Sequence, residues 1–195
     1  MAPVLLIYCE GKTEKLYFEI LSKRIFRIPM YVRVDVYGEK GQHKALIDRV
    51  SAARLELANE EGLEEDEIEC WAVCDDDNMP FTYKELLAYA EENDVNPAFS
   101  RPQFESYLLQ HFEQSRAVKK RNLFDGLSKY KEPVDGEVYD DSSKSNLDWL
   151  ETLLLDRPKL VDMAITNSDQ RGRQSEQPFL TVQNLTKRLR QLERR

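Results

Sequence analysis

Short apolar runs alternate with longer segments of helical periodicity through the first part of the chain. The runs VLLIYC, YVRVDVY and IECWAVCD have the length of strands, and the last is almost continuously apolar, as in a strand buried on both faces. Segments that begin near Lys12, His43 and Tyr83 follow them, and their apolar residues recur with a period of 3.6. This alternation predicts an α/β fold with a mostly parallel sheet and flanking helices.

The pattern changes after residue 114. Just before that point, VNPAFSRP is typical of a short strand and FESYLLQHF of an amphipathic helix. Beyond it the chain reads as helices and loops, and it includes a polar loop rich in Asp and Ser. We expect helices over residues 117–131, 146–155 and from 181 onward, with the loop at 132–145. The prediction is an α/β domain at 1–114 and a helical extension at 115–195 packed on it.

Composition limits the class of protein. The chain has 195 residues, which suits one compact unit. No apolar stretch approaches the roughly 20 residues of a membrane span, and charge follows the first apolar run too soon for a secretory signal. The three cysteines, Cys9, Cys70 and Cys74, lack paired spacing and are expected to be reduced core residues. We therefore expect a cytoplasmic protein without a membrane partner.

Charge is unevenly distributed along the chain. The net charge is −8, but residues 1–114 hold 23 acidic against 12 basic residues, whereas residues 115–195 hold 13 against 16. The basic residues gather in RAVKKR at 116–121 and in KRLRQLERR at 187–195. Each of these basic runs either contacts nucleic-acid phosphates or forms a solvated helix face.

Acidic residues follow two of the predicted strands. Glu10 closes the first strand, and Asp75, Asp76 and Asp77 close the third. In an open parallel sheet, ligands bind at the carboxyl ends of the strands. Because side chains alternate along a strand, Asp75 and Asp77 share a face and Asp76 points away. Mg²⁺ takes one or two carboxylates and keeps several waters, so Glu10, Asp75 and Asp77 form a candidate metal site and catalytic set.

Three other interpretations compete with a metal site. Asp75 to Asn78 are also common turn formers, and Glu10 is also a favourable acid near a helix N-terminus. The GKT at 11–13 imitates a phosphate-binding loop, but Leu6 occupies the position of its first glycine, so ATP binding is not expected. Receiver and phosphotransferase pockets place an Asp on the first strand, where this chain has Glu10, which argues against a carboxylate nucleophile.

Three segments in order carry a resemblance to a known family. They are EGKTE followed by Tyr17 and Phe18, then WAVCDDD, then SRPQFESYLLQHF, and a weaker match continues in PFLTVQNLTKRL. Together they resemble the RloB-like family of Toprim-domain proteins. The resemblance implies a Toprim fold, shared by topoisomerases, primases and OLD-family nucleases, in which a first-strand Glu and a third-strand DxD handle Mg²⁺ at phosphodiesters. It also implies a defence-associated nuclease.

The resemblance places the Toprim Glu on Glu10 and the DxD on Asp75 and Asp77. By the same likeness Glu14 joins a second metal, as in OLD-type nucleases, while its alternative role is that of a first-turn acid favouring the helix dipole. Glu105 either supports the site or completes that second metal.

Four further residues have an ambiguous relation to the site. Arg101 stands where the family usually has Asn, and an arginine beside a metal could bind phosphate instead. The Tyr107 position usually holds Trp. His111, among Leu and Phe, is expected to be a hydrogen-bonded core residue rather than a ligand. Lys12 could pair with a phosphate or with the acidic cluster, although a solvated lysine is the simpler interpretation.

The sequence thus predicts a nuclease or phosphodiesterase that depends on Mg²⁺ or Mn²⁺. It would act on DNA or RNA, with tRNA one candidate, in bacterial anti-phage defence. The alternative is a non-catalytic Toprim-like subunit that binds an ATPase or a restriction complex encoded beside it. A homodimer is a further candidate assembly.

Overall fold

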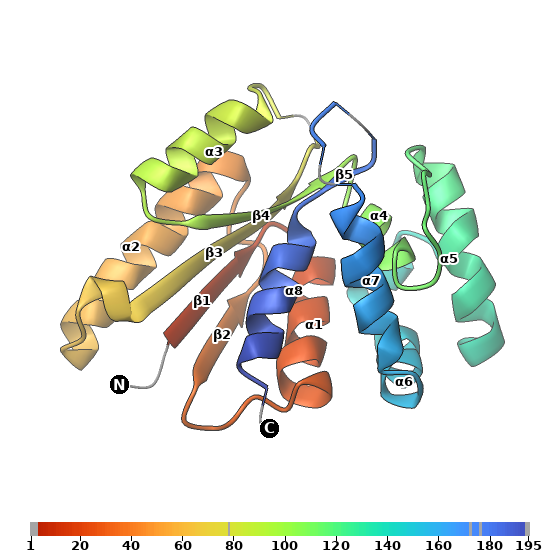
Figure 1. Ribbon diagram of the computed structural model, residues 1–195, viewed down its shortest axis with the longest axis horizontal. Coiled ribbons are helices and arrows are strands. Elements are labelled where there is room, and N and C mark those ends of the chain that lie inside the picture. Colours follow the sequence, from red (N-terminus) through yellow and green to blue (C-terminus); the bar gives the residue numbers. More distant parts are fainter. Residues whose placement is uncertain (1–3, 78, 172, 176, 194–195) are drawn as a thin grey trace.

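A five-stranded sheet forms the centre of the protein. In the computed structural model, which describes residues 4–77, 79–171, 173–175 and 177–193, the strand order is β2-β1-β3-β4-β5 (Figure 1). The first four strands are parallel, and β5 runs antiparallel to β4. The bounds are β1 (Val4–Cys9), β2 (Arg33–Tyr37), β3 (Ile68–Asp75), β4 (Asn96–Arg101) and β5 (Phe179–Leu180).

Helices cover both faces of this sheet. On one face lie α2 (His43–Glu61) and α3 (Tyr83–Glu92), and on the other lie α1 (Lys12–Ile20) and α8 (Val182–Gln191) (Figure 1). The alternation of side chains along β1 explains the two cores, because Leu5 and Ile7 join one and Leu6 joins the other. The strands are therefore buried on both sides, as their continuous apolar character indicates.

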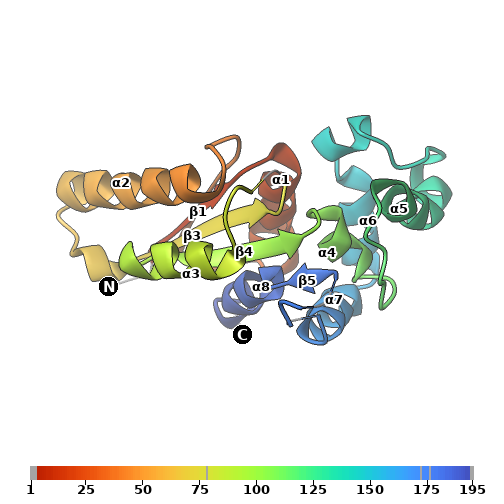
Figure 2. The ribbon, with the colours of Figure 1, turned by 90° about the horizontal axis from the view of Figure 1, so that it is seen from above.

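The remaining helices gather at one end of the sheet. Figure 2 shows α4 to α7 beyond the ends toward which β3 and β4 point. The carboxyl edge of the sheet, where parallel α/β proteins bind ligands, thus faces these helices. This group comprises α4 (Glu105–Leu109), α5 (Lys120–Asp135), the 3₁₀ turn η3 (Ser142–Ser145), α6 (Asp148–Asp156) and α7 (Lys159–Asp169), whereas the π-helical turn η1 (Leu21–Ile25) continues α1 and the 3₁₀ turn η2 (Glu65–Glu67) directly precedes β3.

The predicted α/β class and mostly parallel sheet are confirmed, and some boundaries differ. Helix α5 continues past residue 132 to Asp135 and contains Pro133, where a loop was expected. The helix ends at Gly136, whose φ of 83° suits glycine and whose N–H donates to the Glu132 carbonyl at 2.9 Å. Helix α7 was not predicted, although Leu160, Val161 and Ala164 bury one helical face.

The C-terminal part of the chain returns to the sheet. Strand β5 pairs with β4 through Ser100 and Leu180, and the Thr181 N–H donates to the Phe99 carbonyl at 2.8 Å. The boundary at residue 114 stays a prediction, and the later residues supply both an edge strand and a covering helix, α8. The short β5 was not predicted, because two residues carry no alternation.

The cysteines are small core residues, as expected. Cys9, Cys70 and Cys74 are free and buried. Within the part of the chain that the structure describes, no helix has the length and apolar character needed to cross a membrane.

Candidate metal centre

An acidic cavity of about 260 Å³ opens at the carboxyl edge of the sheet. Its walls come from the ends of β1 and β3, the first turn of α1, the start of α4, and the segment around η3. Six carboxyl side chains line it: Glu10, Glu14, Asp75, Asp77, Glu105 and Asp141. The structure therefore brings together all the predicted metal ligands, including Glu14.

The pairing of β1 with β3 positions the predicted core of the site. These neighbouring parallel strands align Cys9 with Val73, and the Glu10 N–H donates to the Val73 carbonyl at 3.0 Å. Glu10 and Asp75 therefore leave the sheet at the same edge. Beyond the strand, the Asp77 N–H donates to Asp75 Oδ1 at 2.9 Å, a turn that returns Asp77 to the cavity.

Gly11 allows Glu14 to reach the cavity. The glycine precedes α1, and a Cβ atom there would lie 2.6 Å from Glu14 Oε2. The Glu14 side chain therefore occupies the space that any other residue at position 11 would fill. It is only 6% exposed, so its carboxyl group is enclosed by protein.

Burial and mutual repulsion oppose ionisation of three carboxyl groups in the cavity. Burial, together with the smaller effect of the charges of Asp75, Glu105 and Glu10, raises the pKa of Glu14 from 4.5 to about 8, against a backbone hydrogen bond that lowers it. Burial, with the nearby charge of Asp75, raises the pKa of Glu10 to about 7. Burial also raises the pKa of Asp75 to about 6, against a hydrogen bond from the Asp77 N–H that lowers it. At neutral pH the cluster favours a proton or a cation.

One of the two lysines that line the cavity already pairs with a carboxylate there. Lys144 Nζ lies 3.1 Å from Glu105 Oε1, and Glu105 is only 1% exposed. The Tyr139 hydroxyl donates to the same oxygen at 3.2 Å, and Gln103 Nε2 donates to the other at 2.9 Å. Thr13 Oγ1 donates to the Lys144 carbonyl at 2.9 Å and so ties η3 to the first turn of α1. Lys144 thus compensates Glu105 and, by its charge, lowers the pKa of Asp75.

The donor set fits a hard divalent cation. Every carboxyl group of the cavity offers oxygen, the ligand that Mg²⁺ prefers. Glu10 Oε2 is buried and, within the described residues, has no hydrogen-bond partner. In that same part of the chain, no three His, Cys, Asp or Glu side chains already surround a point where a metal would be held. Mg²⁺ does not require three, because it takes one or two carboxylates and completes its shell with water.

The other predicted site residues divide into two groups. Lys12 and Glu105 line the cavity. Arg101 does not, because its Nε pairs with Asp76 Oδ2 at 2.9 Å and its guanidinium lies over the rings of Phe99 and Phe179. Asp76 therefore points away from Asp75 and Asp77, as strand alternation predicts.

His111 is a core residue. It is fully buried, its Nδ1 lies 3.0 Å from the Leu108 carbonyl and its Nε2 lies 3.0 Å from the Tyr17 hydroxyl. A carbonyl only accepts, so Nδ1 carries the proton and Nε2 accepts from Tyr17. Burial lowers the pKa of His111 to about 4, so it is neutral at physiological pH.

The sequence did not reveal the contribution of the segment 139–145. Tyr139, Asp141, Lys144 and Ser145 lie in or beside the predicted loop, and their only signal was a polar stretch, YDDSSKS. Thr13 and Lys144 are separated by 131 positions in sequence, which no local pattern connects. The side chain of Gln42, which hydrogen-bonds to Glu10 and lowers its pKa, was missed for the same reason.

The basic runs are compensated in part by ion pairs within the chain. Lys120 pairs with Asp141 at 2.7 Å and Arg121 approaches Asp125 at 3.7 Å. In the second run the pairs are Lys187 with Asp169, Arg188 with Glu69, and Arg190 with Asp162. Arg194 and Arg195, which end that run, lie outside the described residues. These contacts are those of helix faces that stabilise the fold.

The fold and the cavity define an α/β protein with a carboxylate cluster at the carboxyl edge of a parallel sheet. A family model described as RloB-like protein matches residues 5–189, nearly the whole chain. The chain therefore belongs to the RloB-like family, as its motifs indicated. Comparisons with curated proteins and with solved structures give no significant match.

Proposed function

We propose that this protein is a metal-dependent nuclease or phosphodiesterase that acts on DNA or RNA. The observation that supports it is the convergence of Glu10, Glu14 and Asp75, whose pKa values are all raised, in one cavity. Carboxyl groups with strongly raised pKa values in a cleft mark functional sites, because a fold gains no stability from gathering them. Membership of the RloB-like family supports a setting in bacterial anti-phage defence.

The residues of the cavity have distinct roles in this proposal. Glu10 and Asp75, with Asp77, hold Mg²⁺ or Mn²⁺, and Glu14 and Glu105 stand beside them as ligands of a second ion or as supports. The bound ion supplies Lewis-acid polarisation of the phosphodiester and lowers the pKa of an attacking water. The alternative role of Glu10 is that of general acid or base instead of metal ligand, and its pKa of about 7 in the metal-free protein suits that role at neutral pH. Lys12 and Lys144 offer positive charge to the phosphate.

The test is cleavage by the purified chain with Mg²⁺ or Mn²⁺. Plasmid DNA, single-stranded DNA and tRNA are the substrates, and Glu10→Gln and Asp75→Asn are the variants. We expect cutting of at least one substrate and a loss of about 10²-fold or more in each variant, the usual effect of removing a group that stabilises a transition state. Asp76→Asn is the matched control, because Asp76 pairs with Arg101 outside the cavity. Undiminished cutting by Glu10→Gln and Asp75→Asn would refute the proposal.

A non-catalytic partner subunit is the second candidate. It is favoured by an open, mainly apolar groove of about 720 Å³ between α5, α6 and α7, whose lining includes Tyr130, Leu153, Leu160 and Met163. Such a groove suits contact with another protein. Calorimetry separates the two candidates, because a metal-dependent enzyme binds Mn²⁺ through Glu10 and Asp75. Absence of both metal binding and cutting in the isolated chain would favour the partner role.

A further inference from the structure

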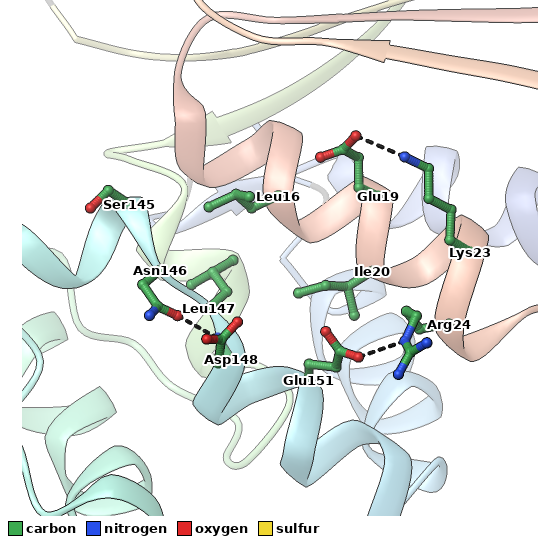
Figure 3. Close-up of a pocket in the computed structure, with 10 residues that line it drawn as sticks. All are labelled: Leu16, Glu19, Ile20, Lys23, Arg24, Ser145, Asn146, Leu147, Asp148 and Glu151. Carbon is green, nitrogen blue, oxygen red and sulfur yellow. Dashed lines mark hydrogen bonds and ion pairs between the residues drawn. The ribbon is translucent and has the colours of Figure 1, made fainter.

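A second cavity continues from the acidic one along α1. This groove, about 420 Å³, lies between α1 with η1 on one side and η3 with α6 on the other (Figure 3). Ser145 lines both cavities. The first turn of α1 borders the acidic cavity with Thr13 and Glu14, and the following turns border the groove from Leu16 onward. The two cavities therefore adjoin at Ser145, between α1 and the segment that contains η3.

The groove has an apolar floor. Figure 3 shows Leu147 pointing toward Leu16 and Ile20, which come from the facing helix. Leu147 and Ile20 are buried, at 2% and 9% exposure. An aliphatic floor favours a flat, weakly hydrated group, and it offers no hydrogen bond or charge to a phosphate. The volume also falls within the range of about 300–1,000 Å³ that small-molecule sites have.

The rim of the groove is rich in hydrogen-bond acceptors. Its two cations are already engaged, Lys23 with Glu19 at 2.9 Å and Arg24 with Glu151 at 2.7 Å (Figure 3). The side chain of Asp148 adds a third carboxylate. Each carboxylate has two oxygens and about four lone pairs, so an oxygen engaged by a cation leaves capacity for an N–H donor. The rim therefore has one carboxylate more than it has cations, and it can accept hydrogen bonds from amino groups.

We propose that this groove binds an unpaired nucleobase of the substrate beside the phosphodiester held in the acidic cavity. This inference rests on the proposed function and specifies its substrate as single-stranded or locally unpaired nucleic acid. A base inside a duplex cannot enter the groove, whereas an unstacked base can lie against the half-buried Leu16, behind which Ile20 and Leu147 close the floor. Carboxylates accept from exocyclic amino groups, so adenine, cytosine and guanine are favoured over thymine and uracil, which have none.

The test measures base preference by binding, independently of cleavage. Fluorescence anisotropy with Ca²⁺ compares labelled single-stranded oligo(dA), oligo(dC) and oligo(dT) of equal length. We expect oligo(dT) to bind about tenfold more weakly, the effect of losing one well-placed base contact. Leu16→Trp fills the groove and should reduce oligo(dA) and oligo(dC) binding to the oligo(dT) level. Leu155→Trp, on the exposed side of α6, is the matched control and should bind like the unaltered protein.

A second variant keeps the inference testable if Leu16→Trp does not fold. Glu151→Gln removes an acceptor carboxylate. It should reduce about fivefold the ratio by which oligo(dA) and oligo(dC) bind more tightly than oligo(dT). Equal binding of all three oligonucleotides, or binding unchanged by both groove variants, would overturn the inference.

The result is separable from the test of cleavage. If cutting requires Glu10 and Asp75 but binding shows no base preference, the proposed base site is refuted and the nuclease proposal stands. If binding is base-selective and depends on Leu16 or Glu151 but no substrate is cut, the proposed base site is supported and the nuclease proposal is refuted. Calorimetric Mn²⁺ affinity should be the same in Leu16→Trp and in the unaltered protein, because position 16 lies outside the acidic cavity.

Discussion

Replacing Glu14 by Gln should stabilise the metal-free protein at alkaline pH but not at acidic pH. In the folded protein, burial raises the pKa of Glu14 from 4.5 to about 8, so the folded state holds a proton that the unfolded state has released. Stability contributed by this group is therefore present below pH 4.5 and is lost as pH rises toward 8. Gln has nearly the same shape and never carries the charge.

The magnitude follows from the pKa difference. Each pKa unit corresponds to about 1.4 kcal/mol, so the rise from 4.5 to about 8 amounts to about 5 kcal/mol once Glu14 is fully ionised. At pH 8 the folded carboxyl is about half protonated, which reduces the loss to about 4 kcal/mol. A buried Gln amide lacks some hydrogen-bond partners, which costs about 1–2 kcal/mol and offsets part of the gain from removing the charge. The expected net gain of Glu14→Gln at pH 8 is about 2–3 kcal/mol.

Urea unfolding followed by circular dichroism, with EDTA present, measures this difference. Glu10 and Asp75 titrate in both proteins, so the comparison of the variant with the unaltered chain at pH 5 and pH 8 isolates Glu14 and its coupling to them. Glu60→Gln, on the exposed side of α2, is the matched control and should follow the unaltered protein at both pH values. A difference between Glu14→Gln and the unaltered chain that is the same at pH 5 and pH 8 would refute the reasoning.

Four further outcomes are expected. Saturating Mn²⁺ should stabilise the unaltered protein by about 3 kcal/mol at a hundred times its Kd, read as a rise in melting temperature that is larger at pH 8 than at pH 5 and absent in Glu10→Gln. Gly11→Ala should displace the Glu14 side chain, because the new Cβ would lie 2.6 Å from Glu14 Oε2, and should weaken Mn²⁺ binding in calorimetry about tenfold. In a Glu14→Ala background this clash is absent, so Gly11→Ala should have no added effect. Arg101→Ala should lower the free energy of unfolding by about 1–2 kcal/mol without changing Mn²⁺ affinity, since it loses the pair with Asp76. The pKa of His111 falls from 6.5 to about 4 on folding, so protonation of His111 should cost the unaltered protein about 3 kcal/mol of stability between pH 6.5 and pH 4. His111→Phe should abolish this loss.

Periodicity was enough to predict the α/β part of the fold. In β1 and β3 nearly every residue is buried, and the continuous apolar pattern follows directly from helices on both faces of the sheet. Prediction was weaker where a boundary depends on contacts distant in sequence. Strand β5 exists because Phe179 and Leu180 meet the edge of β4, a contact that a two-residue pattern does not encode.

The acidic site was predictable in part for a similar reason. Glu10, Asp75 and Asp77 lie at or just beyond the ends of strands whose parallel arrangement already places those ends together, and a turn after β3 directs Asp77 into the cavity and Asp76 away from it. Lys144 had no such signal, because its position depends on how a loop between α5 and α6 returns to α1. The sequence also did not predict the ion-pair partner of Arg101, because its pairing with Asp76 depends on the conformation of the turn after β3.

The origin of Lys144 has a structural consequence for the whole cleft. Five of the six carboxyl groups come from the strand ends, from α1 and from α4, whereas Asp141 and the lysine that compensates Glu105 come from the segment between α5 and α6. Without that segment, Glu105 would be a buried carboxylate with no cation, which costs several kcal/mol. The same segment supplies Ser145 and Leu147 to the groove. Docking of the helical part therefore both stabilises the acidic cavity and forms one wall of the proposed base site, so the two cavities depend on one contact between η3 and α1.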